Sequence, residues 1–542
     1  MTGWPALIAA AQAPAAGLRD ALADPAGQQA RWLSALVARN RDSAFGRRHG
    51  FAQIRSVEDY RAAVPIRGYE AFAADIQRSA AGEPGVLTAE PAIAFEETGG
   101  TTAGAKLLPY TASGLAAFGQ GILPWLADLA QARPGITEGP AYWSISPAGR
   151  PPRRTAGGLT LGLASDAAYL GEELAPTLLG LSAVPPVLGQ LRDLEDWRVL
   201  TLRCLLERDD LAFVSVWSPS FFATLVEGLG RHREALLQAL HDGTPGIPLP
   251  PDWNLTFRPR PERARSVEAA LSGERPDLAA LWPALDTVSC WTDGAAAAAA
   301  ERLAELLPRA RIQGKGLLAT EGMVTLPLTG YDHPVPALTS GFLEFVDPSG
   351  AARLAHQLQA GETYRSVIST ESGLYRYDLG DRLLCREVKD GVPLLRFLGR
   401  ADNISDLVGE KLDEGFVASC LAGLGRFAVL VAVEDRAPYY LVILEGDNAD
   451  AALGQRLDGR LCANPQYAYA RRLGQLGPLR VQTRAGAEQA YLRWRVDQGQ
   501  RLGDVKPPSL IRDAAVARAI WPNLEFAKLG SAGSTRMTEA VL

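Results

Sequence analysis

The sequence predicts an α/β protein with a large N-terminal domain and a smaller α+β C-terminal domain. Residues 141–220 and 285–347 alternate short apolar runs with segments of helical spacing, which is the pattern of an α/β core. The character of the chain changes near residue 400, where an apolar run ends at Gly399 and Arg400. We therefore expect residues 1–400 to form the large domain and residues 401–542 the small one.

Length and composition limit the class of protein. A chain of 542 residues suggests roughly two to four domains, and 47% hydrophobic with 21% charged residues is ordinary for a globular protein. The net charge of −6 argues against nucleic acid as the main partner. The chain has no long apolar run and no basic residue before Arg19, so we expect no membrane span, no signal peptide and a cytoplasmic location.

Cysteine and histidine usage gives no sign of a metal centre. The five cysteines are widely scattered and form no CxxC pair, and the five histidines are equally dispersed. This pattern is typical of a reducing compartment, and it favours neither a disulfide framework nor a zinc site.

Helix and turn signals follow one another through the N-terminal part. Ser56 and Asp59 have the spacing of a capping box, so a helix is expected to begin there and to end before Pro65. The other expected elements are helices over 16–45, 112–131 and 295–310, short strands over 84–95, and a Pro- and Gly-rich surface excursion over 243–263.

The C-terminal part has the signals of a separate α+β unit. Two strand-like runs, 426–433 and 439–445, are joined by a short polar segment, which predicts a β-hairpin. Helices are expected near 449–473 and 487–498, with a further strand over 478–483.

The most informative motif is the Gly/Thr-rich segment from Thr98 to Lys106. Gly99, Gly100 and Gly104 let the backbone approach an anion closely, while Thr98, Thr101 and Thr102 add hydroxyl donors and Lys106 adds a positive charge. It is no Walker A loop, because Ala105 stands where that motif has lysine. A phosphate-binding loop and a plain surface turn are both compatible with this composition.

Two acidic positions follow apolar runs. Thr320 and Glu321 precede a glycine, and a carboxylate at a strand end can hold Mg²⁺ against phosphate oxygens. Gly380 and Asp381 form a second such pair, and an acidic residue at a strand end can accept hydrogen bonds from ribose hydroxyls. Taken alone, each is more typical of a solvated carboxylate or a turn.

Two further signals lie toward the C-terminus. Arg400, with Asp402 and the later Gly409-Glu410-Lys411, could contact a nucleotide near a hinge, although a linker with a local ion pair fits equally well. Lys506 stands before two prolines, in a rigid loop that could direct its ammonium group toward a distant charge, although a solvated loop lysine is the more ordinary interpretation of this residue taken alone.

These five signals occur in the order found in adenylate-forming enzymes, and the chain more narrowly resembles the Gretchen-Hagen-three family of acyl-acid amido synthetases. The stretches that carry the resemblance are FGRRHGFAQIRSVEDYRAAVPIRGYE (45–70), FEETGGTTAGAKLLPYT (95–111), GFLEFVD (341–347), GETYRSVISTESGLYRYDLGDRL (361–383), LRFLGRADNISDLVGEKLDE (395–414) and GDVKPPSL (503–510). The resemblance is clear over residues 43–420, and beyond them only the lysine loop is recognisable.

The resemblance implies a mobile C-terminal lid domain, the use of ATP and Mg²⁺, and a role for each site residue. The phosphates would be held by Thr98, Gly99, Gly100, Thr101, Thr102 and Lys106. Thr320 and Glu321 would lie beside the adenylate, with Glu321 as the Mg²⁺ ligand. Asp381 would bind ribose, Arg400 would contact the nucleotide, and Lys506 would bridge the carboxylate and the α-phosphate.

The chain also departs from the family pattern. Gly99 replaces a common serine of the phosphate loop, Asp378 stands where plant members carry arginine, and Arg365 follows Tyr364 where the usual residue is glutamate. These departures bear on the substrate more than on adenylation.

The resemblance implies that the protein activates a carboxylic acid as acyl-AMP and transfers the acyl group to an amine, with an amino acid as the expected acceptor. We expect the protein to be a monomer. A thiol acceptor, as in an acyl- or aryl-CoA synthetase, is one alternative. An inactive nucleotide-binding fold and a kinase-like ATPase that releases ADP are two others. Tyr110, Tyr142, Trp143 and Phe342 could line the acid pocket, although core packing is the more ordinary role of aromatic side chains.

Overall fold

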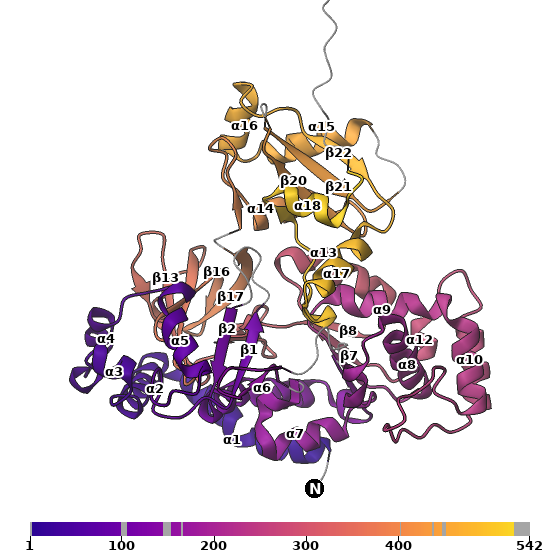
Figure 1. Ribbon diagram of the computed structural model, residues 1–542, viewed down its shortest axis with the longest axis horizontal. Coiled ribbons are helices and arrows are strands. Elements are labelled where there is room, and N and C mark those ends of the chain that lie inside the picture. Colours follow the sequence, from indigo (N-terminus) through magenta and orange to yellow (C-terminus); the bar gives the residue numbers. More distant parts are fainter. Residues whose placement is uncertain are drawn as a thin grey trace, which may run out of the picture.

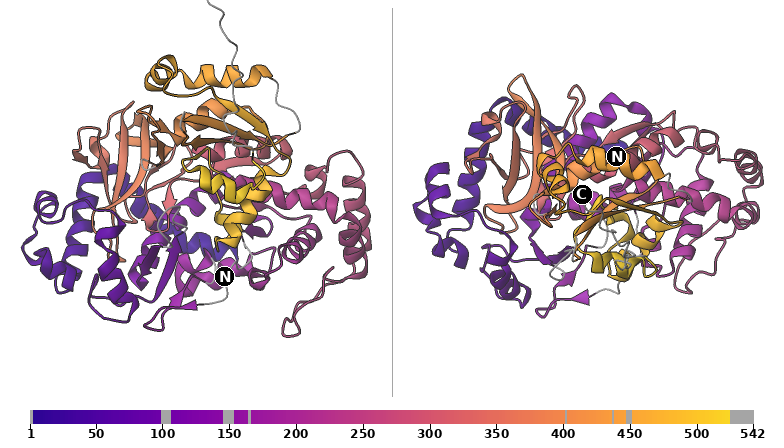
Figure 2. Two further views of the ribbon diagram at one scale, coloured as in Figure 1. Left: turned by 45° about the horizontal axis from the view of Figure 1, so that its top comes forward. Right: turned by 90° about the horizontal axis from the view of Figure 1, so that it is seen from above.

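The computed structural model describes residues 3–98, 106–144, 153–163, 166–400, 403–435, 438–446 and 451–524. Figure 1 shows a broad body formed by the N-terminal and central parts of the chain, with the C-terminal part lying on top of it. Figure 2 (left) shows that a yellow segment near the end of the described chain reaches down to this body.

The N-terminal part of the body begins with α-helices. Those before the first strand are α1 (Trp4–Ala23), α2 (Pro25–Arg39), α3 (Ala44–Arg48), α4 (Val57–Ala63) and α5 (Ala73–Ala80). The capping box predicted for α4 is confirmed, since Ser56 Oγ accepts from the Asp59 N–H and the Asp59 carboxylate accepts from the Ser56 N–H.

The first sheet has the order β2-β1-β5-β4. Its strands are β1 (Ala94–Thr98), β2 (Lys106–Tyr110), β4 (Arg153–Arg154) and β5 (Thr160–Leu161). The strands expected over 84–95 were wrong for residues 84–93. There, the Gly85 and Val86 carbonyls accept hydrogen bonds from the first residues of α3 instead of from a neighbouring strand.

The second sheet is parallel and has the order β3-β6-β7-β8. Its strands are β3 (Ala141–Trp143), β6 (Phe213–Ser215), β7 (Thr287–Cys290) and β8 (Arg311–Gly314). The helices of this region are α6 (Ala112–Ala132), α7 (Gly171–Gly180), α8 (Leu194–Glu207), α9 (Pro219–Arg231), α10 (Arg233–Asp242), α11 (Pro261–Ala270), α12 (Leu278–Leu281) and α13 (Ala297–Leu306). This alternation confirms the predicted α/β core, and α6 and α13 confirm two predicted helices.

The third sheet is antiparallel and has the order β14-β13-β15-β16-β17. Its strands are β13 (Phe342–Val346), β14 (Ala352–Arg353), β15 (Thr363–Ser369), β16 (Tyr377–Lys389) and β17 (Val392–Arg400). Two small hairpins precede it, one from β9 (Leu318–Ala319) and β10 (Gly322–Met323), the other from β11 (Thr325–Leu326) and β12 (Val335–Pro336).

The C-terminal unit is built on a sheet of order β22-β21-β20-β23. The strands are β20 (Ala428–Val433), β21 (Tyr439–Leu444), β22 (Arg480–Thr483) and β23 (Leu510–Ile511), and a small hairpin of β18 (Ile404–Ser405) and β19 (Leu412–Asp413) precedes them. The helices are α14 (Glu414–Leu421), α15 (Ala451–Leu461), α16 (Pro465–Arg472), α17 (Ala487–Asp497) and α18 (Ala514–Ile520). The predicted hairpin, helices and further strand are all confirmed.

The C-terminal unit packs on the body through apolar side chains. Leu492 of α17 and Leu502 lie against Trp197 of α8 and Phe221 of α9, and the four side chains belong to one buried cluster. Arg501 adds a polar contact, because its Nη2 donates to the Leu163 carbonyl over 2.9 Å. Within the described residues, no helix is both long and apolar enough to cross a membrane.

Candidate active site

A tight turn between β9 and β10 presents Glu321 toward three strands of other sheets. The Tyr377 hydroxyl donates to Glu321 Oε1 over 3.2 Å, and the Thr320 carbonyl accepts from the Tyr110 hydroxyl over 2.8 Å. Burial raises the pKa of Glu321, while the Tyr377 hydrogen bond and the charges of Arg400 and Lys106 act in the opposite direction. The positive charges of Arg400 and Lys106 thus favour the ionised carboxylate, and an additional positive ion would favour it further.

Lys106 occupies the first position of β2. Its Nζ lies 5.4 Å from the centre of the Tyr69 ring, and the Tyr69 hydroxyl accepts from the Leu107 N–H over 3.0 Å. Thr98 is the last residue of β1 and is the register partner of Lys106. Gly99, Gly100, Thr101 and Thr102 lie outside the described residues, and the two residues that flank the segment, Thr98 and Lys106, pair across β1 and β2.

Asp381 and Arg400 are register partners on the antiparallel strands β16 and β17. Asp381 is 6% exposed, so its carboxylate is almost completely removed from water. Gly380 has a φ of +73°, and a Cβ at that position would stand 3.3 Å from Arg400 Nη2. The glycine thus permits a left-handed turn and leaves room for the guanidinium beside the acidic residue.

Lys506 enters this region from the C-terminal unit. Its Nζ lies 3.6 Å from the centre of the Trp291 ring and 6.0 Å from that of Phe397. Packing of protein atoms around the ammonium lowers the pKa of Lys506, although the residue keeps contact with solvent. The negative charges of Asp381, Asp504 and Glu414 counteract that shift. Lys506 and Asp381 therefore face the same space from two different parts of the fold.

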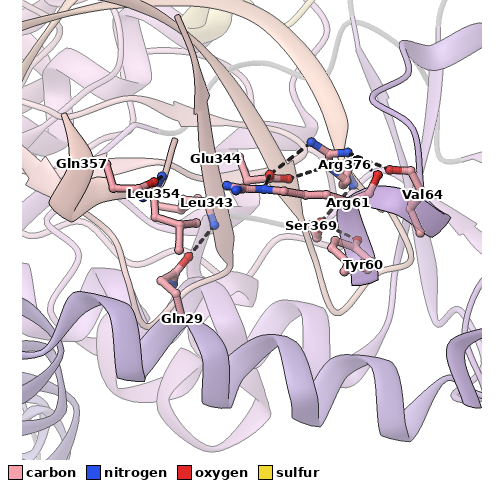
Figure 3. Close-up of polar contacts among 10 residues, drawn as sticks. All are labelled: Gln29, Tyr60, Arg61, Val64, Leu343, Glu344, Leu354, Gln357, Ser369 and Arg376. Carbon is pink, nitrogen blue, oxygen red and sulfur yellow. Dashed lines mark hydrogen bonds and ion pairs between the residues drawn. The ribbon is translucent and has the colours of Figure 1, made fainter. Parts of the chain in front are cut away.

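A buried ionic network lies at the start of β16, the strand that carries Tyr377 and Asp381 (Figure 3). Glu344 of β13 is 1% exposed and accepts from Arg376 Nε over 2.7 Å and from Arg61 Nε over 2.8 Å. Arg376 has a φ of +49°, and its Nη1 donates to the Val64 carbonyl over 2.9 Å. Because Arg376 immediately precedes Tyr377, this network fixes the position at which β16 begins.

The same region shows how two departures from the family pattern compensate each other. Arg365 of β15 and Asp378 of β16 form an ion pair, with 3.1 Å between Nε and Oδ2. The arginine at 365 and the aspartate at 378, which both depart from the family pattern, therefore neutralise each other across two adjacent strands.

The segment 402–411 was considered from the sequence as part of a hinge near the nucleotide. Asp402 lies outside the described residues. Glu410 is fully buried, and its carboxylate accepts from the Leu407 and Val408 N–H groups, each over 2.8 Å, and from the Tyr440 hydroxyl. Lys411 pairs with Asp406 over 2.8 Å. Glu410 therefore holds a loop of the C-terminal unit and has a structural role.

Several residues of the site were not predicted from the sequence. Tyr377 contacts Glu321, Tyr69 contacts Lys106, and Trp291 with Phe397 receives Lys506. Of the aromatic residues considered for an acid pocket, Tyr110, Tyr142 and Phe342 are at most 1% exposed. In the described part of the chain, no cluster of three or more His, Cys, Asp or Glu side chains suits a metal ion.

The fold is that of the adenylate-forming enzymes. A crystal structure of 2-hydroxyisobutyryl-CoA ligase in the postadenylation state, in complex with 2-HIB-AMP, superimposes with a TM-score of 0.53 at 16% identity, covering 92% of this chain and 91% of the ligase. The AtGH3.15 acyl acid amido synthetase in complex with 2,4-DB is more similar, with a TM-score of 0.83 at 19% identity over 94% of this chain and 95% of that one.

Within that class, the chain belongs to the GH3 family. Residues 15–312 match the GH3 family N-terminal domain, residues 335–400 the central domain and residues 405–515 the C-terminal domain. A rice protein (Oryza sativa subsp. japonica) named "Probable indole-3-acetic acid-amido synthetase GH3.1" is 24% identical over 468 residues, which cover 79% of this chain and 73% of that protein. The resemblance found in the sequence motifs is thereby confirmed.

Proposed function

We propose that this chain is an ATP-dependent acyl acid amido synthetase, which adenylates a carboxylic acid and then transfers the acyl group to an amine, with an amino acid as the expected acceptor. The observation that carries the proposal is the convergence of Lys106, Glu321, Asp381, Arg400 and Lys506 on one space. The charges of Lys106 and Arg400 act on Glu321, and those of Asp381 and Arg400 act on Lys506. The membership of the chain in the GH3 family supports the same proposal.

In the proposed first step, the substrate carboxylate attacks the α-phosphate of ATP and pyrophosphate leaves. No side-chain nucleophile is required, because positioning and charge neutralisation supply most of the rate in phosphoryl and nucleotidyl transfer. Lys506 would neutralise charge between the carboxylate and the α-phosphate. Its ammonium lies on the face of the Trp291 ring and keeps contact with solvent, so an incoming anion can reach it.

The same residues suit the nucleotide and its metal ion. Asp381 would accept hydrogen bonds from ribose hydroxyls, Arg400 would contact the nucleotide beside it, and the segment from Thr98 to Lys106 would surround the phosphates. Glu321 offers one carboxylate for Mg²⁺, which usually binds proteins through one or two carboxylates together with substrate phosphates. When bound, Mg²⁺ would neutralise charge on the phosphates, and the Tyr377 hydrogen bond would keep Glu321 directed toward it.

We further propose that residues 1–400 hold the nucleotide and the acid, and that residues 401–542 form a mobile lid that delivers Lys506. In the second step, an amine would attack the acyl adenylate and release AMP. Rotation of the lid between the steps would remove Lys506 and admit the amine while the reactive intermediate stays shielded from water. A monomeric state and a cytoplasmic location stay predictions.

Acid-dependent exchange of labelled pyrophosphate into ATP tests the first step. The panel contains indole-3-acetate, jasmonate, benzoates and medium-chain fatty acids, each with and without Mg²⁺. We expect exchange that depends on both acid and metal, with AMP as the product once an amine is added. Release of ADP in place of AMP would contradict the proposal.

A second experiment identifies the acceptor. Amino acids, hydroxylamine and coenzyme A are each added to the enzyme with an acid that supports exchange, and the products are separated by mass. We expect amides with amino acids. Formation of a thioester with coenzyme A and of no amide would indicate a CoA synthetase instead.

A further inference from the structure

One edge of the parallel sheet carries a set of residues that the proposed reaction does not yet use. Trp217 lies two positions after β6, Trp291 directly after β7 and Lys315 directly after β8. Since the three strands are parallel neighbours, these residues meet at the same edge. In open α/β sheets, ligands bind beside the carboxyl ends of the strands.

The ammonium of Lys315 is enclosed by aromatic rings. Its Nζ lies 4.6 Å from the centre of the Trp125 ring and 4.9 Å from that of Trp217, and it donates to Ser215 Oγ over 2.8 Å. Trp125 is itself fixed, because its Nε1 donates to Gln313 Oε1 over 2.9 Å. An ammonium held in this way exchanges part of its water shell for ring faces, which strengthens its attraction for an anion.

The tryptophans also relate Lys315 to the proposed reaction centre. Trp217 and Trp291 are neighbours, with 5.8 Å between ring centres and a tilt of 35° between planes. Trp291 contacts the ammonium of Lys506, and Trp217 contacts that of Lys315. Two positive charges therefore stand at the two ends of one aromatic wall, and a small organic molecule along this wall would meet a cation at each end.

We propose that Lys315 binds a second substrate carboxylate, one that is not activated, while the carboxylate to be activated lies beside Lys506. This inference rests on the proposed function for the identity of the reacting end. The second carboxylate belongs either to a dicarboxylic acyl acid or to the amino acid acceptor. Trp217 and Trp291 bind the apolar part between the two charges.

The first arm of the test measures binding of acids without ATP by isothermal titration calorimetry. Matched pairs differ only in the second carboxylate: adipate and hexanoate, terephthalate and benzoate, 4-carboxyphenylacetate and phenylacetate. We expect Lys315→Met to weaken binding of the dicarboxylates by at least about tenfold, the size of one charge-assisted hydrogen bond, and to leave the monocarboxylates unchanged. Lys315→Arg should retain most of the preference.

The second arm measures KM in amide formation for glycine and for glycinamide, which lacks the carboxylate. A selective loss for glycine in Lys315→Met assigns the second carboxylate to the amino acid, and a selective loss in the first arm assigns it to the acyl acid. Equal effects on both members of every pair, or no effect in either arm, would overturn the inference.

A matched control separates the site from a general effect of removing a ring-stacked lysine. Lys389 has a similar local environment at the far end of β16, with Nζ 5.6 Å from the centre of the Tyr331 ring and 2.7 Å from the Gly330 carbonyl oxygen. Lys389→Met should change neither arm. Selective dicarboxylate binding without pyrophosphate exchange would support this inference while contradicting the proposed function, whereas pyrophosphate exchange with no selectivity in either arm would do the reverse.

Discussion

The buried network around Glu344 allows a quantitative prediction. Replacing Glu344 by Gln changes one carboxylate oxygen to an amide nitrogen. The substitution thereby removes the negative charge at the centre of the network and keeps the size of the side chain (Figure 3). Glu344 is 1% exposed, and the guanidinium of Arg376 that it binds is also buried. The variant would leave that guanidinium without its counter-charge in a region from which water is excluded.

The expected loss of stability follows from this burial. Breaking a buried ion pair by removing one partner usually costs about 3–5 kcal/mol. The lower end applies here, since glutamine keeps one acceptor oxygen and the Arg61 side chain is 24% exposed and can be hydrated. With an unfolding entropy of about 2 cal/mol/K per residue over roughly 400 residues, a loss of about 3 kcal/mol lowers Tm by roughly 4 °C.

The measurement is thermal unfolding followed by near-UV circular dichroism, with Glu262→Gln as the control. Glu262 pairs with Arg265 over 3.8 Å in a fully exposed setting, so its replacement should shift Tm by less than about 1 °C. A second readout is the KM for ATP, which should rise in Glu344→Gln because Arg376 positions the strand that begins at Tyr377. Equal Tm values for the two variants would refute the reasoning.

Three further predictions concern charge. Lys506→Met should lower the rate of pyrophosphate exchange by at least about a hundredfold. Because the pKa of Lys506 is lowered, the ammonium should lose its proton, and the wild-type rate should decline, at an alkaline pH below the ordinary lysine pKa. A wild-type rate that stays constant up to that pKa would contradict the role of Lys506 in adenylation. Asp378→Arg should lower the stability of the fold because it places two cations together, and adding Arg365→Glu in the same chain should restore it. Chemical denaturation of the single and double variants measures this effect. A double variant no more stable than Asp378→Arg would contradict an interaction between the two positions. Burial raises the pKa of Glu488 to about 7, so this group stabilises the fold below its ordinary pKa of 4.5, and the contribution is lost as the pH rises through 7. Glu488→Gln should therefore gain stability relative to wild type between pH 5 and pH 8, by about 2 kcal/mol, and an unchanged difference in denaturation midpoint across that range would exclude this effect.

Secondary structure was largely predictable where a local signal dominates. The Ser56–Asp59 capping box fixes the start of α4 because the two groups satisfy each other's backbone donors. The hairpin of β20 and β21 follows from two apolar runs and a polar connection. The error at residues 84–93 arose because the partner of that segment is α3, and a local pattern does not reveal which distant backbone accepts or donates a hydrogen bond.

The site was predictable only in its charged members. Lys106, Glu321, Asp381, Arg400 and Lys506 stand in recognisable short motifs. Their aromatic neighbours do not, because an aromatic residue after an apolar strand reads as ordinary core. Trp217, Trp291 and Lys315 each lie just after the end of a strand. Only the parallel order of β6, β7 and β8 makes these three positions neighbours.

The way the C-terminal unit is docked constrains the proposed rotation. Lys506 lies on Trp291 only while Leu492 and Leu502 remain packed against Trp197 and Phe221, since all of these contacts belong to the same placement of the unit. Moving Lys506 away would therefore expose apolar surface, at a cost of about 25 cal/mol for each Å² uncovered. A rotation between the two steps must offset this cost with contacts made in the second placement or with the bound adenylate. Binding energy from the acyl adenylate would then control the movement, so the lid should leave its docked position only after the first step is complete.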